Sequence, residues 1–79
     1  MKVRVDITLK TGVLDPQGEA VRHALGAIGF AGVNAVRQSK MLELDLAETD
    51  PDAARKSVAE MCEKLLANTV IENYSIHIG

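Results

Sequence analysis

Few side chains in this sequence belong to the types that carry out chemistry at neutral pH. The candidates are one cysteine, two histidines and eleven carboxylates, and the cysteine and histidines do not have the spacing of metal ligands. Cys62 falls on the apolar face of a predicted helix, where a thiol packs as a small hydrophobe and is hard to ionise. His23 and His77 fall on polar faces, so surface positions are expected for both. These residues predict no catalytic centre and no metal site.

Two Asp-Pro pairs, Asp15-Pro16 and Asp50-Pro51, are better explained as helix starts than as acid–base groups. A residue before proline is pushed out of helical geometry, which an N-cap requires, while proline loses nothing at the first helical position. Glycines flank the first of these starts, but the Asp15 carboxylate would repel a phosphate. The sequence also has no GxGxxG or P-loop motif, so phosphate binding is not expected.

Composition limits the size, partners and compartment of the chain. Its 79 residues predict a single domain, residues 1–79, and a chain this short buries only about 60% of the surface that its unfolded form exposes. With one Phe, one Tyr and no Trp, the core must be aliphatic and thin, so association with another chain is the expected supplement. Nine basic and eleven acidic side chains, in no block of one sign, argue against nucleic acid. One cysteine and no bilayer-length apolar run predict a reducing cytoplasm and no membrane contact.

The apolar pattern predicts strands at both ends of the chain and two helices between them. Residues 2–10 alternate between polar and apolar side chains, which indicates a strand with one solvated face. Helices are expected from Asp15 to about Ile28 and from Asp50 to about Ala67, each with an apolar stripe. Gly29 should end the first helix in the left-handed region. A last strand alternates over residues 73–78.

Between the helices, residues 33–47 have no Gly or Pro in the middle, and one parity carries the apolar residues Val36, Leu42, Leu44 and Leu46. Two alternatives remain open: a tight hairpin at residues 38–40 that makes two strands, or a single long bent strand. Two pairing segments are the preferred interpretation. The order then becomes βαββαβ, a two-layer α+β fold of the ferredoxin-like arrangement with two helices on one face of an antiparallel sheet. Many unrelated functions use such a fold.

Apolar residues occupy both loops at one end of the predicted sheet. Val13 and Leu14 precede the first helix, and Val70 and Ile71 precede the last strand. They either fold over the end of the sheet or contact another chain. The predicted partner interface comprises both loops, with the residues Lys10, Gly12, Val13, Leu14, Asn68, Val70 and Ile71.

Three stretches of the sequence resemble a known family. They are LKTGVLDPQGEAV (residues 9–21), VRQSKMLELDL (residues 36–46) and EMCEKLLANTVIENY (residues 60–74). Together they are similar to PurS, the small subunit of the multi-subunit phosphoribosylformylglycinamidine synthase, over essentially the whole chain. The sequence departs from the residues usual in that family at Ser39, Thr69 and Asn73, where Gly, Pro and Asp are common.

The resemblance implies a place in an ATP- and glutamine-dependent carbon–nitrogen ligase of de novo purine biosynthesis, which converts formylglycinamide ribonucleotide to the amidine. In that family a glutaminase subunit releases ammonia, and a large synthetase subunit binds ATP, Mg and the substrate. The small subunit joins them and forms homodimers or homotetramers. The resemblance therefore implies no catalytic, cofactor-binding or metal-binding residue in this chain. It implies a role in positioning the partners and in helping ammonia pass between their sites.

Two alternative hypotheses assign the chain to other functional classes. A free-standing regulatory domain that binds a small ligand would share the strand and helix order, and modules of that kind have glycines in the first loop, where this chain has Gly12. An enzyme that acts alone would have to use Cys62 and the two histidines.

Overall fold

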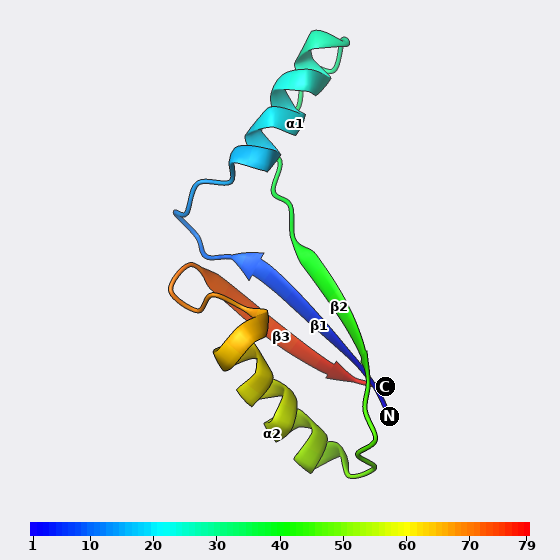
Figure 1. Cartoon of the computed structure of the whole chain (residues 1–79). Helices are drawn as coiled ribbons and strands as arrows, with labels where there is room; N and C mark the ends of the chain where they lie inside the picture. The colour runs from blue at the N-terminus through cyan, green and yellow to red at the C-terminus, as the bar shows by residue number, and fades with distance from the viewer.

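The computed structural model describes all residues, 1–79, and places a helix after each of the first two strands (Figure 1). Along the chain the elements are β1 (Lys2–Leu9), α1 (Pro16–Ala27), β2 (Lys40–Asp45), α2 (Pro51–Met61), a π-helical turn η1 (Cys62–Leu66) and β3 (Glu72–Ile78). The strands form one sheet in the order β2-β1-β3, and both pairings are antiparallel. The predicted α+β class and antiparallel sheet are thus confirmed.

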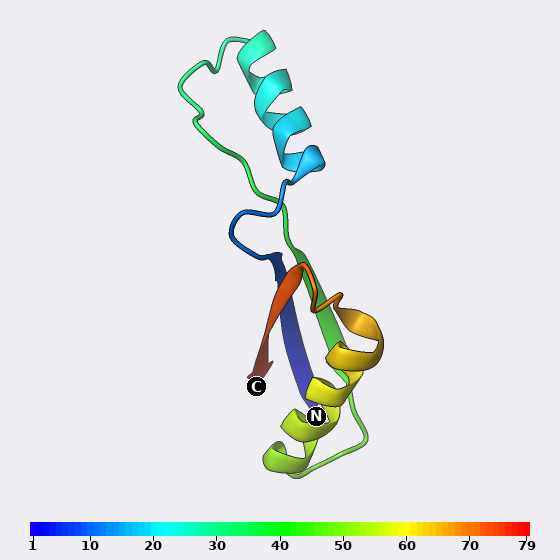
Figure 2. The ribbon, with the colours of Figure 1, turned by 90° about the vertical axis from the view of Figure 1, so that its left-hand side faces the viewer.

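The core lies between one face of the sheet and α2. Alternation along the central strand β1 places Val3, Val5 and Ile7 on this face, where all three are buried. Helix α2 covers them with Val58 and continues through η1 with Cys62, which is also fully buried. Figure 2 shows α2 on one side of the sheet only. The opposite face carries the polar residues of the alternation and has no covering layer.

Helix α1 does not join this core. Residues 11–39, which we call the arm, project beyond the end of the sheet, with α1 leading outward and the following residues returning (Figures 1 and 2). The radius of gyration is 16.1 Å, whereas a compact domain of this length has about 12 Å. This placement corrects the expectation that both helices cover one face of the sheet. The physical reason lies in the hydrogen bonds at the base of the arm, described below.

The segment between the helices also differs from the preferred interpretation. Residues 33–39 run back along α1 and continue without a turn into β2, so no hairpin forms at residues 38–40. Only residues 40–45 of this extended stretch pair with β1. The interpretation of residues 33–47 as two strands is therefore wrong, and the element order is βαβαβ. Without Gly or Pro at residues 38–40, the backbone has no residue that favours a tight reversal.

Candidate interaction site

The two loops predicted to contact a partner lie side by side at one end of the sheet. The backbone N–H of Lys10 donates to the carbonyl of Ile71 at 2.8 Å, which extends the pairing of β1 and β3 by one rung. The first loop turns at Gly12, whose φ of 88° lies in the left-handed region that glycine tolerates best. In the second loop, the Asn68 carbonyl accepts from Ile71 at 3.0 Å and its side-chain oxygen accepts from Val70 at 3.2 Å. Gly12 and Asn68 thus shape the two loops.

One large apolar side chain in each loop is open to solvent. Leu14 is 71% exposed and Val70 is 81% exposed, although both are large hydrophobic residues. A shallow groove of about 470 Å³ lies between the end of the sheet and the start of α1. Its lining comes from the ends of all three strands, the base of the arm and the second loop: Ile7, Leu9, Val13, Leu14, Asp15, Pro16, Gln17, Gln38, Ser39, Lys40, Ile71 and Glu72. An exposed apolar patch of this kind, rimmed by polar groups, is typical of a protein–protein contact.

Asp15 organises the base of the arm. One carboxylate oxygen accepts from the backbone N–H of Gly18 at 2.8 Å, which is the predicted N-cap, and the other accepts from Gln38 at 2.7 Å. The side chain is only 5% exposed. The hydrogen bonds from Gln38 and Gly18, with the nearby Arg37, hold the pKa of Asp15 below its ordinary value. One carboxylate therefore fixes both the start of α1 and the end of the returning segment.

Arg37 is a structural residue of the site that the sequence does not reveal. Its guanidinium donates to the carbonyl of Val13 at 2.7 Å and to the carbonyl of Lys10 at 3.2 Å, so it holds the first loop in shape. In the sequence it is one charged residue on the polar parity of an extended segment. The only signal in the sequence is an Asp at one end of the arm and an Arg at the other. It can be interpreted only when the structure shows that the two ends of the arm meet.

The solvated face of the sheet gathers Ser75, His77 and Asp6, the residue types of a hydrolytic triad. Ser75 Oγ lies 2.7 Å from Nε2 of His77, and Oδ2 of Asp6 lies 3.2 Å from the same nitrogen. A triad needs the carboxylate on one ring nitrogen and the nucleophile on the other, because the imidazole passes a proton between them. Both contacts use one nitrogen here, and the cluster is solvent-exposed. The arrangement is that of a polar network on a sheet surface.

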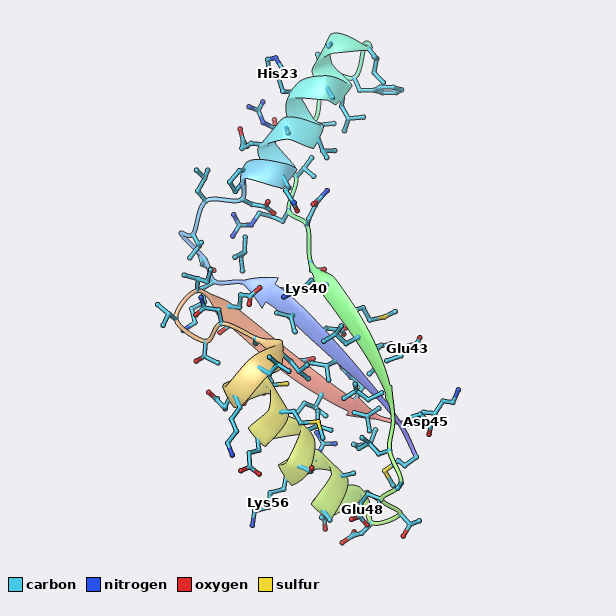
Figure 3. All side chains as sticks on the ribbon, in the orientation of Figure 1. His23, Lys40, Glu43, Asp45, Glu48 and Lys56 are labelled. Carbon is cyan, nitrogen blue, oxygen red and sulfur yellow. The ribbon has the colours of Figure 1, made fainter.

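The remaining candidates for chemistry are separated from one another. His23 projects from the outer half of α1, far from the sheet (Figure 3). Cys62 is buried in the core, where desolvation and, to a smaller extent, the charge of Glu63 raise the pKa of its thiol. The hydroxyl of Tyr74 donates to Glu63 at 3.0 Å, which raises the pKa of the phenol. No three His, Cys, Asp or Glu side chains are grouped so that they could hold a metal ion. None of the helices has the length and apolar character to cross a bilayer.

Comparison with known proteins identifies the family of this chain. The family model of PurS, described as phosphoribosylformylglycinamidine (FGAM) synthase, matches residues 2–79. The chain belongs to the PurS family. The PurS subunit of Bacillus subtilis (strain 168) is 51% identical over 98% of this chain and 90% of its own length. The PurS subunit of Methanocaldococcus jannaschii is 40% identical over 98% of this chain and 93% of its own length.

Solved structures of PurS proteins share this fold. The crystal structure of Methanocaldococcus jannaschii PurS, one of the subunits of formylglycinamide ribonucleotide amidotransferase in the purine biosynthetic pathway, superposes with a TM-score of 0.85. It is 42% identical and covers 96% of this chain and 92% of its own length. The Thermotoga maritima PurLQS structure superposes with a TM-score of 0.84 at 29% identity, over 96% and 93% of the two chains. A match this complete includes the arm, so its projection beyond the sheet is a property of the PurS fold.

These comparisons confirm the family expected from the three sequence stretches. They also confirm the role of a subunit of phosphoribosylformylglycinamidine synthase, a ligase of purine biosynthesis.

Proposed function

We propose that this PurS chain is a non-catalytic subunit that joins the glutaminase and synthetase subunits of phosphoribosylformylglycinamidine synthase. The observation that carries the proposal is the pair of hydrogen-bonded loops at the end of the sheet, where the large apolar residues Leu14 and Val70 are mostly exposed. A rigid framework with exposed apolar side chains suits docking, because little conformational freedom is lost on binding. The PurLQS structure of Thermotoga maritima is of an assembly that contains a PurS chain.

The partner surface comprises the residues singled out from the sequence. Val13, Leu14 and Ile71 line the groove, Val70 stands beside it, and the turn at Gly12 and the cap at Asn68 hold the two loops. Lys10 supplies the hydrogen bond that joins the loops and adds a positive charge at their edge. We expect one of the two larger subunits to cover this groove.

The proposed contribution to the reaction is positional. ATP, Mg and glutamine are used by the partner subunits, where ammonia released by the glutaminase must reach the synthetase before it is lost to water. If the glutaminase and synthetase sites are held in a fixed arrangement, ammonia passes directly between neighbouring sites and does not have to diffuse through water. This proximity alone can increase the rate of the synthetase reaction strongly. No side chain of this chain has to react. We expect the complex to work in the reducing cytoplasm, where the single thiol of Cys62 stays free.

We also propose that the subunit works as a homodimer or homotetramer. Only nine of the 79 residues are buried, and most of α1 has no cover, so a single copy stabilises its arm poorly. Association with a second copy is a direct way to bury this surface.

Complex formation tests the proposal. The glutaminase and synthetase subunits, mixed with and without this chain, should be analysed by size-exclusion chromatography with light scattering. We expect a complex that contains all three chains to form only when this chain is present. A glutaminase–synthetase complex that forms equally well without it, and never incorporates it, would overturn the bridging role.

A further inference from the structure

We infer that an extended segment of one of the two larger subunits adds as a strand to the free edge of β3 and places a basic side chain beside Glu63. The inference rests on the proposed bridging function and names the backbone surface through which it acts. Three features of the chain lead to it: a strand edge without the usual protection, a contact loop that leads directly into this edge, and an unpaired carboxylate beside it.

Hydrogen bonds show which backbone groups of β3 face outward. The N–H of Lys10 donates to the carbonyl of Ile71 at 2.8 Å, and the N–H of Gly79 donates to the carbonyl of Lys2 at 3.3 Å. In an antiparallel pair, hydrogen-bonded and non-hydrogen-bonded positions alternate. The odd-numbered residues of β3 therefore bond to β1. The groups that point away from the sheet belong to Glu72, Tyr74, Ile76 and Ile78.

Most of these outward groups have no partner within the chain. The N–H of Glu72 donates to the carbonyl of Asn68 at 2.8 Å, and the carbonyl of Ile76 accepts from the guanidinium of Arg55 at 3.2 Å. The remaining outward groups are open, because β3 is an edge strand. Figure 2 shows no helix or strand on its outer side. An extended segment that adds here satisfies the backbone groups of both chains.

Strand β3 also lacks the features that usually protect such an edge. Its seven residues, Glu72–Ile78, include no Lys, Pro or Gly. Its pairing with β1 is continuous over its whole length, so it contains no bulge. Edge lysines, prolines and bulges are the common obstacles to pairing with another chain. The edge of β3 is therefore free to accept a strand.

The second contact loop leads directly into this edge. Residues 68–71 end where β3 begins, and Val70 in this loop is 81% exposed. A subunit that covers Val70 is within reach of the first outward groups of β3. Strand addition would extend the contact along the edge by about 20 Å. This continuity favours a larger subunit, which is proposed to cover the loops, as the occupant.

A carboxylate without a cation lies beside the same edge. Glu63 on η1 accepts a hydrogen bond from the hydroxyl of Tyr74 at 3.0 Å and takes part in no ion pair. Since Tyr74 is a residue of β3, this bond holds the Glu63 carboxylate above the edge strand on the side of α2. A negative charge is thus fixed at a defined place along the edge.

The surroundings of Glu63 suit a basic side chain. A polar pocket of about 360 Å³ is lined by Glu63 together with Lys10, Thr69, Glu72, Asn73 and Tyr74. The Glu72 carboxylate already accepts from the backbone N–H of Asn68 at 2.7 Å and lies 3.7 Å from the amine of Lys40. Glu63 is therefore the acceptor left for an incoming cation. In strand addition, backbone bonds supply affinity and such pockets select alternate side chains.

The same charge argues against a second copy of β3 as the occupant. Strand β3 contains no Lys or Arg, so pairing two copies edge to edge brings no such cation to Glu63. An extended segment with a Lys or Arg meets both requirements, the open backbone and the unpaired carboxylate.

Amide hydrogen exchange tests strand addition residue by residue. The complex of this chain with the glutaminase and synthetase subunits is exposed to heavy water and quenched, and exchange is measured on this chain by mass spectrometry with electron-transfer fragmentation. In the free chain, Ser75 and His77 should exchange slowly because they bond to β1, whereas Tyr74 and Ile76 should exchange fast. In the complex, the exchange of Tyr74 and Ile76 should slow by at least about tenfold.

The possible outcomes separate this inference from the bridging function. Fast exchange of Tyr74 and Ile76 in a complex that contains this chain would overturn strand addition and leave the bridging function intact. Slow exchange of both in the free chain, increasing with its concentration, would identify a second copy as the occupant and overturn the assignment to a larger subunit. Absence of any complex would overturn the bridging function, on which the inference depends.

A single backbone change gives a second test. Native chemical ligation at Cys62 yields the full chain with an N-methyl group at Ile76, which removes one outward N–H and keeps the side chain. The melting temperature should stay close to that of the unmodified ligated chain, while binding to the larger subunits should weaken by about tenfold or more. An N-methyl group at Ser75 is the matched control and should lower the melting temperature, because this N–H faces β1. Unchanged binding by the Ile76 variant would contradict strand addition.

Charge reversal tests the basic side chain of the partner. Glu63→Lys should weaken binding to the larger subunits by about tenfold or more at low salt, and the difference from the parent chain should shrink as salt is added. Glu43→Lys makes the same charge change on β2, at the other edge of the sheet, and should bind like the parent chain. Equal binding by the Glu63→Lys and Glu43→Lys chains would overturn the assignment of a cation to the Glu63 pocket.

Discussion

Asp15 and Gln38 are separated by 23 residues, yet the carboxylate of the first accepts a 2.7 Å hydrogen bond from the backbone N–H of the second. This bond closes the base of the arm, because the outgoing and returning chains meet there. Arg37 closes it from the other side through the carbonyls of Lys10 and Val13. The arm is thus a fixed projection of the sheet, and its direction is set by a few polar contacts.

The two Asp-Pro caps provide a matched pair for testing this role. Asp50 accepts only from Asp52 at 3.2 Å through its side chain, whereas Asp15 accepts from two segments. Asp50→Ala should cost about 1 kcal/mol, the usual value for an N-cap. Asp15→Ala should cost clearly more, because a backbone N–H of the returning segment also loses its acceptor. Urea unfolding followed by circular dichroism measures both, and equal losses would show that Asp15 acts as a cap only.

Because of the Asp15 carboxylate, we expect the stability of the folded chain to depend on pH. Since the pKa of Asp15 is lower in the folded chain than the ordinary value of 3.8, the folded state binds fewer protons than the unfolded state in this range. The stabilisation is fully present above the pKa of the unfolded state. It is lost as the pH falls through the lower pKa of the folded state. The urea midpoint should therefore drop between about pH 5 and about pH 2. Asp15→Asn should flatten this dependence, and a variant as steep as the parent would assign the effect to other carboxylates.

Replacing either of two glycines in α1 by alanine should change the stability of the chain in opposite directions. A Cβ at Gly18 would collide with the backbone carbonyl of Val36, whereas a Cβ at Gly26 would meet nothing within 4 Å. Gly26→Ala should therefore stabilise the chain by up to about 1 kcal/mol through helix propensity. Gly18→Ala should destabilise it, because the returning segment must move away from α1. Thermal unfolding of both variants checks the prediction, and a stabilised Gly18→Ala chain would contradict the close packing of these segments.

The exposed loops should matter for assembly and little for folding. Leu14→Asp and Val70→Asp change side chains that are 71% and 81% exposed, so the melting temperature of each variant should stay close to that of the parent chain. Binding to the larger subunits should weaken by at least tenfold, because a charge enters an apolar contact. Lys56→Glu on α2, on the opposite side of the helix from the sheet in Figure 3, is the control. Unchanged binding by both loop variants would show that this end of the sheet is free in the complex.

Local features of the structure follow from the sequence. Alternation over residues 2–10 predicts β1, and both Asp-Pro pairs begin helices where expected. Gly29 has the predicted left-handed φ of 106°, and the N–H of Phe30 bonds back to the carbonyl of Leu25 at 2.8 Å. Each of these signals depends on the conformational preference of a residue and its near neighbours. Such preferences are visible within a few positions of the chain.

The arm could not be predicted in the same way. Apolar residues on α1 predict burial against something, but they do not say whether the cover comes from the same chain. The decisive contacts join Asp15 to Gln38 and Arg37 to Val13, and each spans more than twenty residues. The expected extended segment is present at residues 33–39, but these residues pair with no strand. The π-helical turn at residues 62–66, where α2 was expected to continue regularly, likewise carries no local signal.

The most direct test of the account is glutamine-dependent formation of the amidine by the purified glutaminase and synthetase subunits, measured as this chain is titrated in. We predict that turnover is near background without it, rises with the amount added and saturates at a fixed ratio, and that Cys62→Ala restores it equally well. Full turnover by the two larger subunits alone, or any amidine formation by this chain alone, would contradict the account.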